Sequence, residues 1–159
     1  MNLNVLLDDY LKDPRIFQIA DRLVLSKPQR LYLKNLHGSA SQFVFTGIFR
    51  HDLASQVNHL IVLNDAEEAA YFHNSLENLT SALNVFYFPS SFKNRKNYRQ
   101  LNASHVMLRT EMLTRFSTAT GNRVGAVITY PEALFEKVVL PKTLSGNMIR
   151  IKAGDTINV

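Results

Sequence analysis

The chain has 159 residues, of which 46% are hydrophobic and 19% are charged. This composition is typical of one globular domain and excludes a disordered or low-complexity chain. The formal net charge of +5 is moderate, and the absence of cysteine excludes disulfides and thiolate metal sites. No secretory signal pattern and no run of about 20 apolar residues occurs, so we expect a cytoplasmic protein without a membrane span.

Two helices are predicted in the first 28 residues. Leucines recur at helical spacing at positions Leu3, Leu6, Leu7 and Leu11. Asp13 followed by Pro14 is typical of a helix cap and a first helical position, and the break at Pro28 ends the second helix. Residues 1–28 are therefore expected to form an N-terminal helical segment.

Strands and helices alternate from residue 29 onward. Strands are predicted at residues 30–34, 60–63, 85–88 and 125–129, with a short last strand at 149–151. Helices are predicted at residues 38–49, 66–79 and 108–116 and from Pro131 onward, with Asn64 as a cap. This order indicates a parallel α/β sheet with helices on both faces in a domain spanning residues 29–147. Functional groups of such sheets lie at the carboxyl ends of the strands, here 35–41, 64–66, 89–99 and 129–132.

A glycine-containing turn follows the first predicted strand, where a P-loop would lie. A working P-loop needs glycines around the phosphates, a lysine for their charge and a hydroxyl residue for magnesium. The corresponding residues in this chain are His37, Gly38, Ser39, Ala40, Ser41 and Gln42. Because Ser41 replaces the lysine and Gln42 the hydroxyl residue, we predict a degenerate phosphate loop that does not bind ATP productively. The alternative is a simple strand-to-helix turn capped by Ser39.

The sequence offers no other recognisable chemistry. Asn64-Asp65 after the second of these strands is a poor match to the acidic pair that holds magnesium in nucleotide hydrolases. The five histidines include no pair at i, i+4, so no metal site is predicted. Gly38-Ser39 lacks the spacing of a nucleophile elbow. We therefore predict no catalytic residue and no metal ligand.

Four cations are concentrated in one predicted loop, at Lys93, Arg95, Lys96 and Arg99. With Phe92 and Tyr98 nearby, this loop could hold phosphates by charge and a base by stacking. The other interpretation is a solvated loop whose cations pair with acidic groups elsewhere. Both interpretations remain open from the residues alone.

Several short pieces of this sequence have a family resemblance in their order and spacing across residues 30–159. The pieces are Leu36-His37-Gly38-Ser39-Ala40, Asp65 to Ala70, Phe88-Pro89, Arg109, Ala126 to Leu134 and Gly154. Together they resemble the N-terminal module of bacterial transcription-repair coupling factor. That module looks like the B component of the nucleotide-excision nuclease, so the resemblance implies a P-loop NTPase-like fold with a decayed phosphate loop.

The resemblance also implies a role for the parent protein. It is an ATP-driven DNA translocase that displaces stalled RNA polymerase and recruits the A component of the excinuclease for nucleotide-excision repair. ATP and magnesium then belong to a motor beyond residue 159, and no cofactor is expected in this fragment. Residues 148–159 would begin the domain that binds the A component. The basic residues at 93–99 depart from the acidic, aromatic family pattern, and no DNA-gripping hairpin fits here.

Three functions are therefore compared. The first is a non-catalytic module that serves protein–protein contacts or autoinhibition in a transcription-coupled repair factor. The alternative is a small nucleic-acid-binding module that uses the basic loop at 92–99. The third is an enzyme with an unrecognised site, which would show a deep pocket at the strand ends with convergent polar groups.

Overall fold

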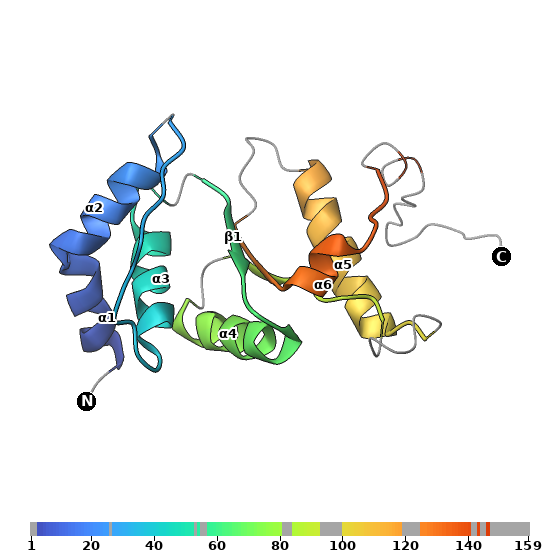
Figure 1. Cartoon of the computed structure of the whole chain (residues 1–159), viewed down its shortest axis with the longest axis horizontal. Coiled ribbons are helices and arrows are strands. Elements are labelled where there is room, and N and C mark those ends of the chain that lie inside the picture. The colour runs from blue at the N-terminus through green and yellow to red at the C-terminus, as the bar shows by residue number, and fades with distance from the viewer. Residues whose placement is uncertain are drawn as a thin grey trace, which may run out of the picture.

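The computed structural model describes residues 3–25, 27–52, 54, 57–80, 84–92, 100–118, 125–140, 143 and 146. Six helices and a three-stranded parallel sheet are found in this part of the chain (Figure 1). In chain order they are α1 (Leu3–Lys12), α2 (Pro14–Leu23), α3 (Ala40–Arg50), β1 (His59–Val62), α4 (Ala66–Leu79), β2 (Val85–Tyr87), α5 (Ala103–Thr118), β3 (Ala126–Thr129) and α6 (Pro131–Phe135). The predicted parallel α/β class is confirmed, whereas the P-loop NTPase-like identity stays a prediction.

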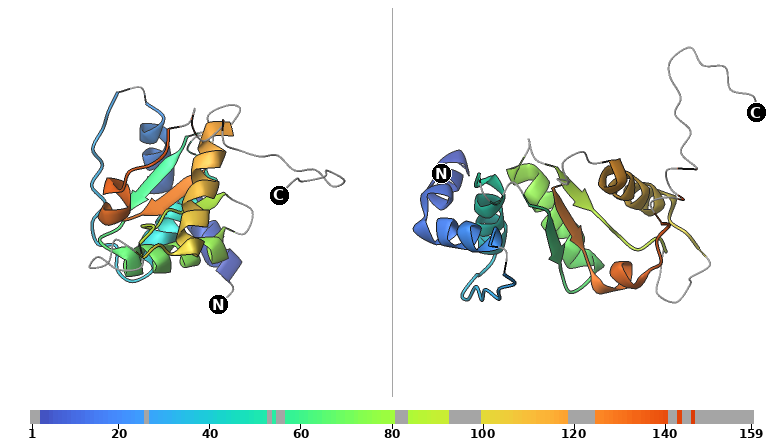
Figure 2. Two further views of the ribbon diagram at one scale, coloured as in Figure 1. Left: turned by 90° about the vertical axis from the view of Figure 1, so that its right-hand side faces the viewer. Right: turned by 90° about the horizontal axis from the view of Figure 1, so that it is seen from above.

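The first three helices pack together at one end of the molecule (Figure 2). Asp13 begins α2 as predicted, because its side chain accepts a hydrogen bond of 2.8 Å from the backbone N–H of Arg15. Ile16 of α2 packs at about 3.5 Å from the position that a Cβ on Gly47 of α3 would occupy. The absence of a side chain at Gly47 therefore lets these two helices approach closely.

The sheet has the strand order β1-β3-β2, with both outer strands parallel to β3. All four residues of β3 are buried, as expected for a central strand of a parallel sheet. Successive side chains of a strand point to opposite faces. Ile128 accordingly packs in the core beneath α4, and Val127 packs with Met112 of α5. Helices therefore cover both faces, as the sequence predicted.

Coverage of β1 is one-sided. Ile61 is buried with Phe72 of α4 on one face. The neighbouring side chains Leu60 and Val62 point to the other face and remain 61% and 48% exposed. The reason is the position of α5, which packs against β2, the strand furthest from β1.

The strand predicted at residues 30–34 is wrong. This segment pairs with no described strand, and Tyr32 within it is 87% exposed. The alternation around Leu31 and Leu33 is real, but alternation stabilises a strand only when a neighbouring strand offers its edge. Asn35, with φ of 61°, turns the backbone just beyond this segment. The segment instead borders α2 and α3, and the predicted strand at 149–151 lies outside the described residues.

Candidate functional site

The segments that the sequence places at the strand ends form two separate regions. One lies beyond β1 and includes the glycine turn and the start of α4. The other lies beyond β2 and β3 and includes the segment after Phe88 and the exit of α6. Their chemistry differs, so each is described by itself.

The glycine turn at residues 37–42 begins α3 but is not preceded by a strand. Gly38 has φ of +55°, a conformation that favours glycine. The backbone N–H of Ala40 donates to the carbonyl oxygen of His37 at 3.1 Å, which closes the turn. Ser39 occupies the cap position, but its side chain makes no capping hydrogen bond. Ser39 therefore holds the predicted cap position, but its side chain does not stabilise the start of α3 by a hydrogen bond.

The two positions that would carry the P-loop lysine and hydroxyl residue are engaged with each other. Ser41 donates from its hydroxyl to the side-chain Oε1 of Gln42 at 2.9 Å. Gln42 is only 5% exposed and also accepts, through its backbone carbonyl, a bond from the Thr46 hydroxyl. Neither side chain carries the charge that the outer phosphates of a nucleotide require.

A groove of about 440 Å³ runs between the glycine turn, β1 and α4. Its walls are mostly apolar side chains, among them Leu36, Phe45, Leu63 and Phe72. Among the described residues that line it, Glu68 is the one with a formal charge. An apolar groove with a carboxylate disfavours a phosphate group, and this groove borders the glycine turn.

The acidic residues after β1 are used to begin a helix. Asp65, rather than the predicted Asn64, caps α4, because its side chain accepts a bond of 2.8 Å from the backbone N–H of Glu68. Glu68 in turn accepts from the backbone and the side chain of Asn64, at 3.0 and 2.7 Å. This arrangement is a variant of the capping box, because Glu68 accepts from Asn64, the residue before the cap, and not from the backbone N–H of Asp65. The Asn-Asp pair after this strand therefore takes part in the start of a helix.

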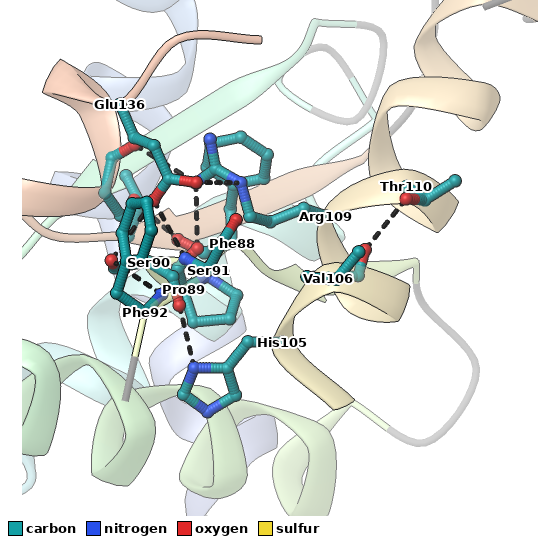
Figure 3. A network of polar contacts seen from close by, with 12 residues as sticks. Phe88, Pro89, Ser90, Ser91, Phe92, His105, Val106, Arg109, Thr110 and Glu136 are labelled. Atoms are coloured by element: carbon teal, nitrogen blue, oxygen red, sulfur yellow. Dashed lines mark hydrogen bonds and ion pairs between the residues drawn. The ribbon is translucent and has the colours of Figure 1, made fainter. Parts of the chain in front are cut away.

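The second region is centred on Arg109 of α5 (Figure 3). Arg109 is only 4% exposed. Its Nη1 donates to the carbonyl oxygens of Pro89 and Ala133, at 2.8 and 3.1 Å. Its guanidinium carbon lies 4.0 Å from the ring centroid of Phe88. A cation over an aromatic face is stabilised by the ring's electrons. Arg109 thus joins α5, the segment after β2 and α6.

Glu136, directly after α6, supplies the opposite charge. Its Oε2 accepts from the backbone N–H of Ser91 and the hydroxyl of Ser90, at 2.8 and 3.1 Å, and its Oε1 lies 3.6 Å from Nε of Arg109 (Figure 3). Burial raises the pKa of Glu136, but these hydrogen bonds and the nearby guanidinium outweigh burial and hold that pKa below its ordinary value. Burial lowers the pKa of Arg109, while Glu136 opposes that shift.

Further hydrogen bonds complete this closed end of the sheet. The backbone N–H of Ser90 donates to the Tyr130 hydroxyl at 2.8 Å, and its carbonyl oxygen lies 2.8 Å from Nδ1 of His105. Thr129 donates to the carbonyl of Phe88 at 2.8 Å. The polar groups at this end therefore mostly bond to one another, although Nη2 of Arg109 is buried without a hydrogen-bond partner among the described residues. We name Arg109, Glu136 and their hydrogen-bond partners the polar network.

Sequence reasoning found only part of this network. Arg109 is one of the residues that carry the family resemblance, whereas the sequence predicts no role for Glu136. Nothing local distinguishes Glu136, which lies between the exposed residues Phe135 and Lys137. The spacing of Arg109 and Met112, three residues apart on one helix face, is a signal that could have pointed to Glu136. A cation on a buried helix face requires a partner of opposite charge.

The four cations predicted as a nucleic-acid contact, Lys93, Arg95, Lys96 and Arg99, lie outside the described residues. The residues that flank them are described. Phe92 and Leu101 form an antiparallel bridge, and the backbone N–H of Asn102 donates to the carbonyl of Ser91 at 2.8 Å. The nucleic-acid interpretation of these cations therefore stays a prediction.

Membrane-spanning and metal-binding features are absent from the described residues. No described helix has the length and apolar character needed to cross a membrane. The same residues contain no group of three or more His, Asp or Glu side chains placed to hold a metal ion. No family model, curated protein or solved structure matches the chain. Fold and site together define a small parallel α/β domain with an apolar groove at one strand end and a closed polar network at the others.

Proposed function

We propose that this chain is a non-catalytic protein-interaction module from a transcription-repair coupling factor. The observation that carries the proposal is the chemistry around the glycine turn. At the place where a nucleotide hydrolase would grip phosphates, this protein has an apolar groove, a buried Gln42 and the acidic Glu68. A surface of this composition suits a protein partner better than a nucleotide.

The polar network supports a non-catalytic role. Of its ionised groups, Arg109 is buried and Glu136 is half-buried, and both are bonded to backbone or hydroxyl groups. A general acid or base needs a pKa near the working pH, whereas the pKa of Glu136 is held below its ordinary value. The network therefore joins α5, α6 and the segment after β2 instead of presenting reactive groups to a substrate.

The partners follow from the resemblance carried by the sequence. In a coupling factor, ATP and magnesium serve the motor, while DNA, RNA polymerase and the A component of the excinuclease are bound by the parent protein as a whole. Within that protein this module would contact other domains and restrain the motor. The proposal implies a cytoplasmic location and transcription-coupled DNA repair as the process.

Two measurements test this function. Calorimetric titration of the chain with ATP–magnesium, and separately with a short DNA duplex at physiological salt, is expected to show no binding. Adding the chain to a coupling factor that lacks residues 1–159 is expected to lower the ATPase rate of that factor. Micromolar ATP binding, or an ATPase rate that the added module leaves unchanged, would contradict the proposal.

A further inference from the structure

The groove lies along the side of β1 that faces away from the rest of the sheet. Ile61 of β1, the following Leu63 and Phe45 of α3 line it. No residue of β3 lines the groove among those described, although β3 is the strand paired with β1. The groove therefore borders the free edge of β1, where a further strand could be added.

The backbone of β1 offers hydrogen bonds along this edge. The N–H groups of His59 and Leu63 donate to Gly125 and Thr129, at 2.9 Å each, which places alternate residues on the β3 side. In a strand the intervening residues direct their N–H and C=O groups the opposite way. Leu60 and Val62 therefore present their backbone groups to the free edge, where no described strand pairs with them. Such an edge is a template for an added strand.

A side-chain donor lies in the same groove. Gln42 lines it and is 5% exposed, yet only its Oε1 has a side-chain partner, the Ser41 hydroxyl. Its Nε2 donates no hydrogen bond within the described part of the chain. Nε2 is not among the buried side-chain atoms that lack a partner, so this donor is accessible. An accessible amide donor in a groove suits a peptide carbonyl, because peptide backbones supply such acceptors at regular intervals.

The charge at one end of the groove specifies the occupant further. Glu68 is the charged residue lining it, and Asp65 and Glu67 stand beside it in the first turn of α4. This end is acidic although the chain as a whole carries +5. Local electrostatic complementarity then favours an occupant with a cation at this end.

We propose that this groove is the docking site for an extended peptide of a partner protein, which adds as a strand to the free edge of β1 with apolar side chains in the groove and a basic residue beside Glu68. The proposal rests on the proposed function and names the surface that it uses. The apolar walls receive every second side chain, as strand addition requires. Leu60 and Val62, exposed on the other face, meet the remaining side chains.

The test uses two fluorescein-labelled synthetic peptides in anisotropy titrations. In each, three valines alternate with two threonines, and the two ends carry lysine in one peptide and glutamate in the other. The lysine peptide is expected to bind about tenfold more tightly, because like charges beside Glu68 repel the glutamate peptide. Glu68→Gln keeps the capping hydrogen bonds and is expected to reduce this ratio to about twofold or less.

Hydrogen exchange identifies the mode of binding. The lysine peptide is expected to slow exchange of the Leu60 and Val62 amides and to leave that of Leu63, already bonded to β3, unchanged. Leu36→Asp places a charge in the groove wall and is expected to abolish binding. Leu140→Asp is the matched control, because Leu140 is 72% exposed and lies outside the groove, and it is expected to bind normally.

Other outcomes are also decisive. Absence of binding by the folded chain, or binding without slower exchange at Leu60 and Val62, would overturn the groove proposal. The groove proposal is also overturned if sedimentation shows that the chain forms a dimer and hydrogen exchange shows that the dimer, without peptide, protects these amides. If the Leu36→Asp chain still lowers the ATPase rate of the coupling factor that lacks residues 1–159, the proposed function stands. The surface that contacts the partner then lies outside the groove.

Discussion

The carboxyl end of β1 and the carboxyl ends of β2 and β3 occupy equivalent places in the sheet but are built from opposite chemistry. Beyond β2 and β3, the buried Arg109 and the half-buried Glu136 are hydrogen-bonded to the protein's own groups in a polar network. Beyond β1, an apolar groove stays open beside the capping box of Asp65 and Glu68. The difference shows that topology gives the place where a site can form, while individual side chains decide whether it is open.

The largest expected effect comes from breaking the closed end. Arg109→Ala leaves the charge of Glu136 without its partner and the carbonyls of Pro89 and Ala133 without a donor. Loss of one member of a buried ion pair typically lowers the free energy of unfolding by about 3–5 kcal/mol. Denaturant unfolding followed by circular dichroism measures this change.

A matched control lies on the same helix. Arg115 is exposed, so Arg115→Ala is expected to change the free energy of unfolding by about 0.5 kcal/mol or less. The combination of Arg109→Met with Glu136→Gln is expected to lose less than the two single changes added together, because the charges are removed as a pair. Equal losses for Arg109→Ala and Arg115→Ala would show that the network does not hold this end closed.

A smaller effect is expected at the open end. Asp65→Ala removes the cap of α4 and is expected to lower the free energy of unfolding by about 1 kcal/mol. Asp65→Asn retains an acceptor and is expected to cost only a few tenths of a kcal/mol. Thermal unfolding of the two variants compares them directly. If Asp65→Ala lowered the free energy of unfolding as much as Arg109→Ala does, the two ends would contribute equally to the stability of the fold.

The contribution of Glu136 to the stability of the fold depends on pH. The folded-state pKa of Glu136 is lowered, so its contribution to stability is fully present above its ordinary value and is lost as pH falls through the folded-state value. We expect the stability advantage of the unchanged chain over Glu136→Gln to be constant at neutral pH and to shrink below the ordinary carboxyl range. Asp13, whose pKa is lowered to about 2 by its bonds to Arg15, behaves with the same sign. An advantage that grows on acidification would contradict this assignment.

The sequence predicted what depends on local pattern and failed where a distant partner decides. The apolar run from Leu60 to Leu63 and the helical spacing of α4 identified β1 and the helix that covers it, because both patterns are local. The run is typical of a strand buried on both faces, but alternate residues of β1 are exposed, because no described helix covers its second face. The same reasoning placed a strand at residues 30–34, since alternation records side-chain pattern but not the presence of a neighbouring edge. Glu136 was missed for the equivalent reason: its partners come from α5 and from the segment after β2.

The smallest expected effect sharpens the comparison most. If the open end were only a P-loop with a missing residue, restoring its lysine by Ser41→Lys would restore nucleotide binding. We expect no ATP binding up to about millimolar concentration, a level that corresponds to about 4 kcal/mol of binding free energy. The turn is not preceded by a strand of the sheet, and the groove beside it is apolar with an acidic end.

Calorimetry with ATP–magnesium measures this outcome, and Leu140→Lys, which adds the same charge at an exposed position outside the groove, is the control. Micromolar binding by Ser41→Lys alone would mean that the loop has lost one charge and kept its phosphate-binding backbone.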